Sequence, residues 1–328
     1  MKIAVAGSVA RDHLMTFPGK FSDAILPDSL HKLSVSFLVD GLEIRRGGVG
    51  ANIAFGLGVM GLDPILIAAV GKDWEDYNSW LTRHGVNTDH VLISENLYTA
   101  SFTVTTDTTL SQVASFFPGA MQEARNIELE PIINHVGPFD LLIISPDDPE
   151  AMRRHTQTAK RLCIPYVADP SQQLSSMDPE LIKELIDGAD YLFLNEYELE
   201  LAQSRTGWNQ EELFSKVRVQ VTTLGSQGAR IQEHGKETIM VKPPKERVKE
   251  DPTGVGDSFR AGFLSALSWG LNHERCAQVG SMLATYCLEN KGTQEYHFTR
   301  EEFLSRFEDS YGLKATQELE GYFRPNLG

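Results

Sequence analysis

DPTGVGDSFRAGF, residues 251–263, is the most informative segment of the sequence. Gly254 and Gly256 let the backbone approach an anion closely, and the apolar-periodic residues after Asp257 predict a helix whose first N–H groups point into the loop. Such a loop forms an anion hole, and an Asp beside it can take the proton from an attacking hydroxyl group. A plain glycine turn, with Asp257 as the N-terminal cap of the helix, explains the same residues.

Outward from this loop, short apolar runs alternate with segments of helical period along most of the chain. The apolar runs lie at residues 3–6, 64–70, 141–144, 165–168, 191–194 and 220–224. The helical segments lie near residues 49–60, 73–85, 150–162, 178–187 and 196–206, and then at 257–270, 273–289 and 299–309. This alternation is typical of a parallel sheet that is covered by helices on both faces. We therefore expect an α/β fold.

Two stretches, 14–44 and 98–117, break the alternation because their β-prone runs are not followed by helices of their own. These runs are residues 35–39, 103–106 and 113–117. Strands without crossover helices predict a small separate sheet that projects from the main domain and acts as a lid over the substrate. The predicted division is a core of residues 1–13, 45–97 and 118–328 and a β lid of residues 14–44 and 98–117.

Composition excludes several classes of protein. The 328 residues are 41% hydrophobic and 23% charged, which is typical of a globular chain. Thirty basic residues against 45 acidic ones give a net charge of −15 without a basic stripe, so we expect no nucleic-acid partner. No apolar run approaches the roughly 18 residues of a membrane span. Cys163, Cys276 and Cys287 are few and widely spaced, which predicts buried thiols and a cytoplasmic location.

A second glycine cluster, RRGGVGANIA at residues 45–54, opens a predicted helix of small residues. The Asn52 amide there suits a polyhydroxylated molecule such as a sugar ring, although a plain loop-to-helix junction explains the cluster equally well. Gly56-x-Gly58-x-x-Gly61 fits the dinucleotide fingerprint, but it lies in a helical pattern rather than after a strand. The chain has no Walker loop, and its nine histidines show no zinc-ligand spacing.

Four ordered motifs together resemble those of the ribokinase-like (phosphofructokinase B) carbohydrate and nucleoside kinases. Gly47-Gly48-x-x-Ala51-Asn52, with Gly61 and Gly71-x-Asp73, resembles the N-terminal signature, and residues 251–257 resemble the C-terminal one. NEYE at 195–198 fits the family's Asn-x-x-Glu, and TLGSQG at 223–228 fits its nucleotide loop. The resemblance spans the chain from Gly7 to about Gly292. It implies a three-layer α/β/α fold with a mainly parallel sheet and a small projecting β-sheet lid.

A closer likeness is to the adenosine kinases of mycobacteria and related bacteria, at residues 7–15, 33–40, 168–174, 251–263 and 292–295. It implies ATP-dependent phosphorylation of the 5′-hydroxyl of adenosine to AMP, a step of purine salvage. A kinase for a free sugar such as ribose or fructose is the alternative within the family. A non-catalytic nucleotide-binding module is the alternative outside enzymes.

The resemblance also implies a role for individual residues. Asp257 would be the general base, and the amides of Gly254, Val255 and Gly256 would form the anion hole. The ribose hydroxyls would be held by Asp12, Gly48 and Asn52. The remaining nucleoside contacts would be the polar residues Ser8, Ser36, Gln172 and Gln173 and the base-enclosing Phe102 and Phe116.

For the nucleotide, the resemblance implies ATP contacts at Asn195, Thr223, Leu224, Gly225, Ser226, Gln227, Gly228, Gly256 and Gly292. Glu198 would support Mg²⁺ through water. Asp251 and Thr253 resemble the monovalent-cation loop of ribokinases, so K⁺ is a candidate ion there. Related bacterial kinases often pair through their lids, and an exposed β edge seeks a partner, so we expect a homodimer.

The residues themselves agree with a substrate that carries a base, because Phe37, Phe102, Phe116 and Phe117 on β-prone segments can stack on a purine. Aromatic residues on strands are nevertheless usually core. Without the family resemblance, a loop cap or a solvated charge explains Asp12 as well as a ligand contact does. A surface loop is the alternative for Gln172 and Gln173. Asn195 and Glu198 then become a helix cap and a surface acid.

Overall fold

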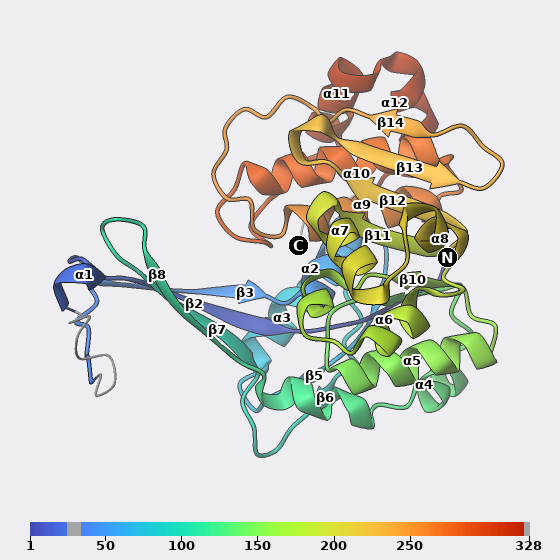
Figure 1. Ribbon diagram of the computed structural model, residues 1–328. Helices are drawn as coiled ribbons and strands as arrows, with labels where there is room; N and C mark the ends of the chain where they lie inside the picture. Colours follow the sequence, from blue (N-terminus) through green and yellow to red (C-terminus); the bar gives the residue numbers. More distant parts are fainter. Residues whose placement is uncertain (25–33, 325–328) are drawn as a thin grey trace.

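The computed structural model describes residues 1–24 and 34–324, and it contains a large sheet and a smaller one (Figure 1). The large sheet has eight strands in the order β14-β13-β12-β11-β10-β9-β1-β4. Its strands are β1 (Ile3–Ala6), β4 (Ile65–Ile67), β9 (Leu141–Ile144), β10 (Tyr166–Ala168), β11 (Tyr191–Asn195), β12 (Val219–Thr223), β13 (Ala229–Glu233) and β14 (Ile239–Val241). The pairs from β4 to β12 are parallel, and β13 and β14 add to the edge as antiparallel strands.

Helices cover both faces of this sheet, and alternate strand residues explain why. Ile3 and Val5 of β1 belong to one hydrophobic cluster, whereas Ala4 and Ala6 belong to another on the opposite face. The first cluster packs against α2 (Val49–Val59), α3 (Glu75–Arg83), α9 (Val255–Ser268), α10 (His273–Leu288), α11 (Arg300–Tyr311) and α12 (Leu313–Glu320). The second packs against α4 (Leu129–Val136), α5 (Pro149–Arg161), α6 (Pro179–Ile186), α7 (Glu196–Thr206) and α8 (Gln210–Ser215). The predicted α/β fold with a mainly parallel sheet is confirmed.

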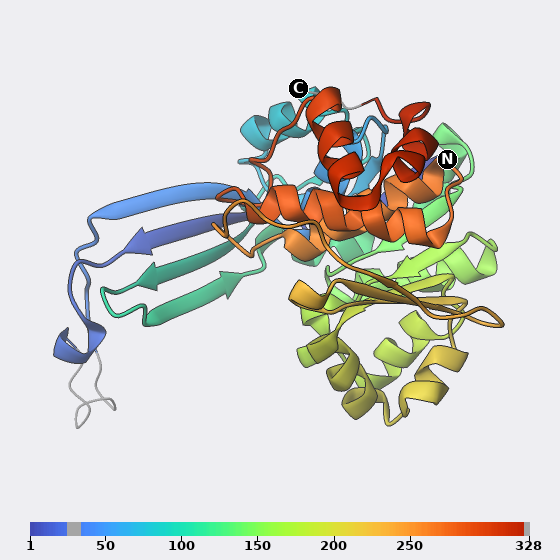
Figure 2. The same cartoon turned by 90° about the horizontal axis from the view of Figure 1, so that it is seen from above.

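The smaller sheet has the order β3-β2-β7-β8, and Figures 1 and 2 show it projecting from the main body. Its strands are β2 (Ala10–Thr16), β3 (Gly41–Gly47), β7 (Ala100–Thr106) and β8 (Gln112–Phe117). At its far end, Phe17 and Phe37 pack against Phe21 of the short α1 (Phe21–Ala24). A smaller separate sheet is therefore confirmed. The exact division into core and lid stays a prediction, because residues 25–33 lie outside the described part of the chain.

One predicted strand run is wrong. Residues 35–39 are not a strand, although their composition is β-prone. The strands of this region are instead β2 and β3, which contain Arg11, Asp12, Glu43 and Arg45. They pair with each other over seven residues, so backbone pairing decides the structure where a projecting sheet leaves its faces half-exposed. The predicted run 64–70 also divides into β4 and β5 (Ala69–Val70), and β5 pairs with β6 (Leu92–Ile93).

The cysteines follow the prediction in two cases of three. Cys276 and Cys287 are buried on α10, whereas Cys163 is exposed in the turn after α5. The turn explains the difference, because Cys163 has a positive φ of 53° between helix and strand rather than a place on a packed face. Among the described residues, no helix combines the length and apolar character that a membrane crossing requires.

Candidate functional site

A cavity of about 600 Å³ lies where the smaller sheet joins the carboxyl edge of the large one. Ser8 follows β1, Pro146 follows β9, and Gln172 follows β10, so strand ends form its floor. This edge is where open α/β sheets bind their ligands. The cavity is lined by Ser8, Ala10, Asp12, Gly48, Val49, Asn52, Phe102, Phe116, Met121, Pro146, Ser171, Gln172, Gln173, Ser175, Ser176, Thr253, Gly254, Asp257 and Thr293.

The start of α9 brings the 251–257 loop to this cavity. Gly254 is the residue before the helix and has a φ of +75°, a conformation that L side chains rarely adopt. Asp251 Oδ1 accepts a hydrogen bond of 2.9 Å from the Thr253 backbone N–H, which closes the turn. Because the first N–H groups of a helix have no partner within it, the start of α9 favours an anion at the predicted amides of Gly254, Val255 and Gly256, of which the Val255 N–H also lies 3.4 Å from the Pro252 carbonyl oxygen.

Asp257 is a half-buried carboxylate on the first turn of α9. Asn52 Nδ2 donates a hydrogen bond of 2.8 Å to its Oδ2. Burial raises the pKa of Asp257 above its ordinary value, while Arg260 and Asn52 oppose this rise and Glu198 adds to it. Asp257 therefore lines the cavity as a carboxylate with a raised pKa, which suits a proton acceptor.

A chain of buried hydrogen bonds fixes the orientation of Asn52. Its Oδ1 accepts from Thr293 Oγ1 at 2.8 Å and from Gln294 Nε2 at 2.9 Å, so its Nδ2 must face Asp257. Gln294 Nε2 also donates to the hydroxyl of Tyr77 at 2.6 Å, and that hydroxyl donates to the Gly47 carbonyl at 2.8 Å. An amide nitrogen has two donors, so one N–H of Asn52 remains for a ligand. The amide therefore supports Asp257, and its remaining N–H is available for the sugar contact that the sequence predicts.

Asp12 and Gly48 lie on the wall beside Asn52. Burial raises the pKa of Asp12 to about 6, with Asp251 adding to the rise and Arg45 opposing it. Gly48 precedes α2 with a φ of +93°, and a β-carbon there would lie 2.6 Å from backbone atoms of Ser8, Val9 and Ala10. This close approach lets Ser8 Oγ accept from the Val49 N–H at 3.2 Å. Ser8 thus also supports the start of α2.

Two aromatic side chains of the smaller sheet, Phe102 and Phe116, line the cavity and are called its aromatic roof below. Phe102 lies opposite Phe116 in the β7–β8 register and beside Asp12 in the β2–β7 register, so all three share one face. Phe102 is 36% exposed and Phe116 is 52% exposed, which leaves their rings available to a ligand. Phe117 is the next residue of β8 and faces the opposite side.

Gln172 and Gln173 lie on the short 3₁₀ helix that follows β10, Ser171–Ser175. Gln173 Nε2 donates to the Asp147 carbonyl at 2.6 Å. Ser171 has a positive φ of 42°, and its hydroxyl lies 3.0 Å from Gln172 Oε1 and 3.2 Å from Glu198 Oε1. Ser171 therefore joins the glutamine wall of the cavity to α7.

Most of the residues predicted for the nucleotide, Asn195 and the loop 223–228, do not line the cavity but lie along the same edge of the large sheet. Asn195 ends β11 and pairs in register with Thr223, which ends β12. Asn195 and Glu198 form a capping box, in which Asn195 Oδ1 accepts from the Glu198 N–H at 2.8 Å and Glu198 Oε2 accepts from the Asn195 N–H at 2.8 Å. The loop that follows β12 comprises Thr223, Leu224, Gly225, Ser226, Gln227 and Gly228. Gly292 donates its N–H to Asp251 Oδ2 at 3.1 Å.

Ser36 is not brought to the cavity. It is exposed in the segment before β3 and beside Phe37, whose ring packs at the far end of the smaller sheet. Conversely, sequence reasoning missed Met121, Pro146 and Arg260. A single arginine in the apolar pattern of residues 257–270 is the one signal that could have drawn attention to Arg260, because a buried cation needs partners.

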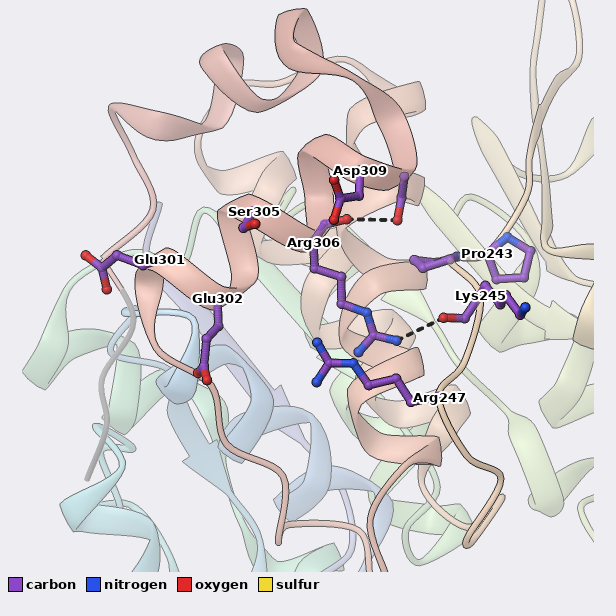
Figure 3. A pocket seen from close by; sticks show the side chains of 10 residues that line it. Pro243, Lys245, Arg247, Glu301, Glu302, Ser305, Arg306 and Asp309 are labelled. Atoms are coloured by element: carbon purple, nitrogen blue, oxygen red, sulfur yellow. Dashed lines mark hydrogen bonds between the residues drawn. The ribbon is translucent and has the colours of Figure 1, made fainter.

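Another cavity, of about 710 Å³, lies between residues 243–247 and α11 (Figure 3). Its walls combine Lys245 and Arg247 with Glu301, Glu302 and Asp309. It contains no residue of the predicted site, and Arg306 Nη2 bonds the Lys245 carbonyl at its edge. The chemistry described above therefore belongs to the cavity under the smaller sheet.

Comparison with known proteins identifies the family of this chain. The profile described as pfkB family carbohydrate kinase matches residues 12–299. A nucleoside kinase of Methanocaldococcus jannaschii is 30% identical over 309 residues, 94% of this chain and 97% of that protein. The nucleoside kinase of Burkholderia thailandensis in complex with inosine has a TM-score of 0.83 at 29% identity, covering 95% of this chain and 99% of its own. Its complex with ADP-inosine has a TM-score of 0.80 at 31% identity, covering 95% of this chain and 96% of its own.

Proposed function

This chain belongs to the pfkB family of carbohydrate kinases, and on that premise we propose that it transfers the γ-phosphoryl group of ATP to the 5′-hydroxyl of adenosine. The products are AMP and ADP, as purine salvage requires. One observation carries the proposal: Asp257, at the start of α9, opens into the same cavity as Asp12, Phe102 and Phe116. A proton acceptor, a carboxylate for hydroxyl groups and two aromatic faces are what a nucleoside acceptor needs.

The aromatic roof favours a nucleoside over a free sugar. A free sugar has no flat apolar face as large as a purine, whereas Phe102 and Phe116 present two partly exposed rings on one face of the smaller sheet. Gln172 adds amide donors and acceptors that suit the polar edge of a base. The relatives named nucleoside kinases support the same substrate class, and one of them binds inosine. Adenosine itself rests on the sequence resemblance.

The residues of this chain divide the chemistry between them. Asp12 and the free N–H of Asn52 orient the ribose, and Asp257 takes the proton as the 5′-oxygen attacks the phosphorus. The new O–P bond forms while the bond to the ADP oxygen breaks. The amides from Gly254 to Gly256 stabilise the charge that spreads over the transferring group. Closure of the smaller sheet over the cavity would exclude water and limit ATP hydrolysis.

The residues along the neighbouring edge fit ATP and Mg²⁺. In the loop after β12, a β-carbon at Gly225 would meet no atom within 4 Å, so the loop backbone is open there, and the loop begins at Thr223, the strand partner of Asn195. When bound, Mg²⁺ neutralises the phosphate oxygens. Glu198 Oε1 and Oε2 each accept one hydrogen bond and keep lone pairs for water-mediated contact with the ion. For K⁺, Asp251 and Thr253 are the candidate positions, although Arg45 Nη1 already lies 3.7 Å from Asp251 Oδ2.

A homodimer through the smaller sheet and a cytoplasmic location belong to the same proposal. β8 is an edge strand, and all six of its residues are exposed, including Val113 and Phe117. An unpaired edge with apolar side chains favours pairing with another chain. Sedimentation of wild type and of a V113E/F117E double variant tests this, and a monomeric wild type contradicts it.

The deciding experiment is a competition between acceptors. Purified protein with Mg·ATP is given adenosine, inosine, cytidine, ribose and fructose at equal concentrations, and the phosphorylated products are quantified. We expect AMP to predominate. A preference for inosine would change the predicted nucleobase but keep nucleosides as the substrate class. A preference for a free sugar would overturn the nucleoside assignment. If no ADP forms with any of these acceptors, the kinase assignment is wrong.

A further inference from the structure

Arg260 is a buried cation directly behind the proposed catalytic loop. It follows Asp257 by three residues on α9, so the two side chains lie on the same side of the helix. Only 7% of Arg260 is exposed. A β-carbon at Gly256 would lie 2.8 Å from Arg260 Nη1, so the guanidinium occupies the space that the missing side chain leaves. The positive charge is therefore beside the peptide groups of the anion hole.

Three carboxylates from three different elements surround this guanidinium. Arg260 Nη2 lies 2.7 Å from Oδ1 of the fully buried Asp169, which follows β10. It also lies 3.9 Å from Glu198 Oε2 on α7. Its charge reaches Asp257 as well, because Arg260 opposes the rise in the pKa of that carboxyl. Asp169 Oδ2 and Arg260 Nε have no hydrogen-bond partner among the described residues, so charge attraction is what compensates their burial.

We propose that Arg260 is a positioning residue for phosphoryl transfer, which holds Asp257, Asp169 and Glu198 in one arrangement and adds positive potential behind Gly256. The inference rests on the proposed function. With all three carboxylates ionised, the cluster carries −2 with Arg260 and −3 without it. A more negative cluster repels the phosphoryl group that must approach it, and that repulsion is strong where water is excluded. The arginine therefore matters most in the transition state, where negative charge spreads on the transferring group.

A purely structural role makes a different prediction. A buried ion pair that only stabilises the fold can be replaced by two neutral residues at little cost, whereas removing one partner leaves an unpaired charge. The double variant R260Q/D169N therefore restores stability under both interpretations. It also returns the cluster to −2, but it restores neither the cation behind Gly256 nor the guanidinium beside Glu198 and Asp257, so turnover recovers in full only if the role is structural.

The chain offers a matched control in Arg306. Its Nη2 pairs with Glu289 Oε1 at 2.6 Å, and the two side chains are 9% and 8% exposed, close to the values for Arg260 and Asp169. Arg306 lies at the separate cavity of Figure 3, which contains no residue of the proposed site. R306Q therefore measures what the loss of a buried arginine does to the fold alone.

The test compares steady-state kinetics and thermal unfolding of wild type, R260Q, R260K, R260Q/D169N and R306Q, using whichever acceptor the wild type phosphorylates best. We expect R260Q to lower kcat about 10- to 100-fold with less than about a threefold change in the acceptor KM, because the lost interaction acts mainly in the transition state. R260K keeps the charge and is expected to recover most of that loss. R306Q is expected to lower the unfolding temperature without lowering kcat.

Two outcomes overturn the inference while leaving the proposed function intact. One is a kcat of R260Q equal to that of R306Q. The other is recovery of both stability and the full wild-type kcat in R260Q/D169N, which also decides the matter if R260Q alone fails to fold. A wild-type protein that phosphorylates no acceptor overturns the proposed function and the inference together.

Discussion

Replacing Asp257 by Asn is expected to remove most of the activity without harming the fold. The side chain keeps its shape, and its amide oxygen can still accept the hydrogen bond of 2.8 Å from Asn52 Nδ2. It can no longer take the proton of the attacking hydroxyl. Because a positioned base contributes about 10²- to 10⁴-fold, kcat is expected to fall by that factor.

The effect of D257N on stability follows from the pKa of the carboxyl. Burial raises it above 3.8, with Glu198 adding to the rise and Arg260 and Asn52 opposing it, and Asp169, Cys287 and Tyr296 are the other titratable groups that interact with it. The folded state then binds the proton more tightly than the unfolded state. Wild-type stability is therefore lost as pH rises from about 4 through the folded pKa, by about 1.4 kcal/mol for each unit of difference. Asn does not titrate, so the variant avoids this loss.

The assay combines ADP release with urea unfolding at about pH 5 and about pH 8. D257N should be at least as stable as wild type at the higher pH, and its advantage should shrink at the lower pH. Asp63→Asn, at an exposed position of the turn after α2, is the control and should alter neither turnover nor stability. Near wild-type turnover of D257N would refute the role of Asp257 as the general base. Destabilisation of D257N by the same amount at both pH values would refute the electrostatic reasoning.

Three further changes test the cavity and its surroundings. F102A or F116A is expected to raise the nucleoside KM roughly 5- to 100-fold, as the loss of a stacking face worth about 1–3 kcal/mol implies, and an equal rise in the KM for ribose would contradict the aromatic roof. D12N is expected to raise the nucleoside KM about 10- to 100-fold with a smaller effect on kcat, because hydrogen bonds to a charged group are worth about 1.5–3 kcal/mol, and an unchanged KM would exclude Asp12 from binding. D147N should raise the unfolding temperature at about pH 8 more than at about pH 5, since burial raises the pKa of Asp147 to about 8 and its Oδ2 has no partner in the described part of the chain. A rise in unfolding temperature that is the same at both pH values would show that ionisation of Asp147 is not its cause.

The sequence predicts the large sheet well because parallel strands are buried on both faces and appear as apolar runs such as Leu141–Ile144. The position of Asp257 follows for a similar local reason, since Gly254 and the apolar pattern after it mark the start of a helix. The smaller sheet is harder, because β2 and β3 contain charged residues and their pairing is decided by contacts distant in sequence. Composition favoured residues 35–39 instead. Ser36, which the resemblance implies as a nucleoside contact, lies in that segment before β3 and does not line the cavity.

The partners of a buried polar residue are what a sequence conceals most completely. Asn52 belongs to a visible glycine motif, but the two donors that fix its amide, Thr293 and Gln294, are some 240 residues away. They orient its Nδ2 toward one side of Asp257, while Arg260 supplies charge from within α9. A general base in a site that excludes water must stay ionised although burial opposes the charge. A neutral donor alone would leave the repulsion from Glu198 uncompensated, and a cation alone would leave the carboxylate free to rotate. Together the two supports hold one oxygen of Asp257 and offset its charge, which leaves the other oxygen for the substrate hydroxyl.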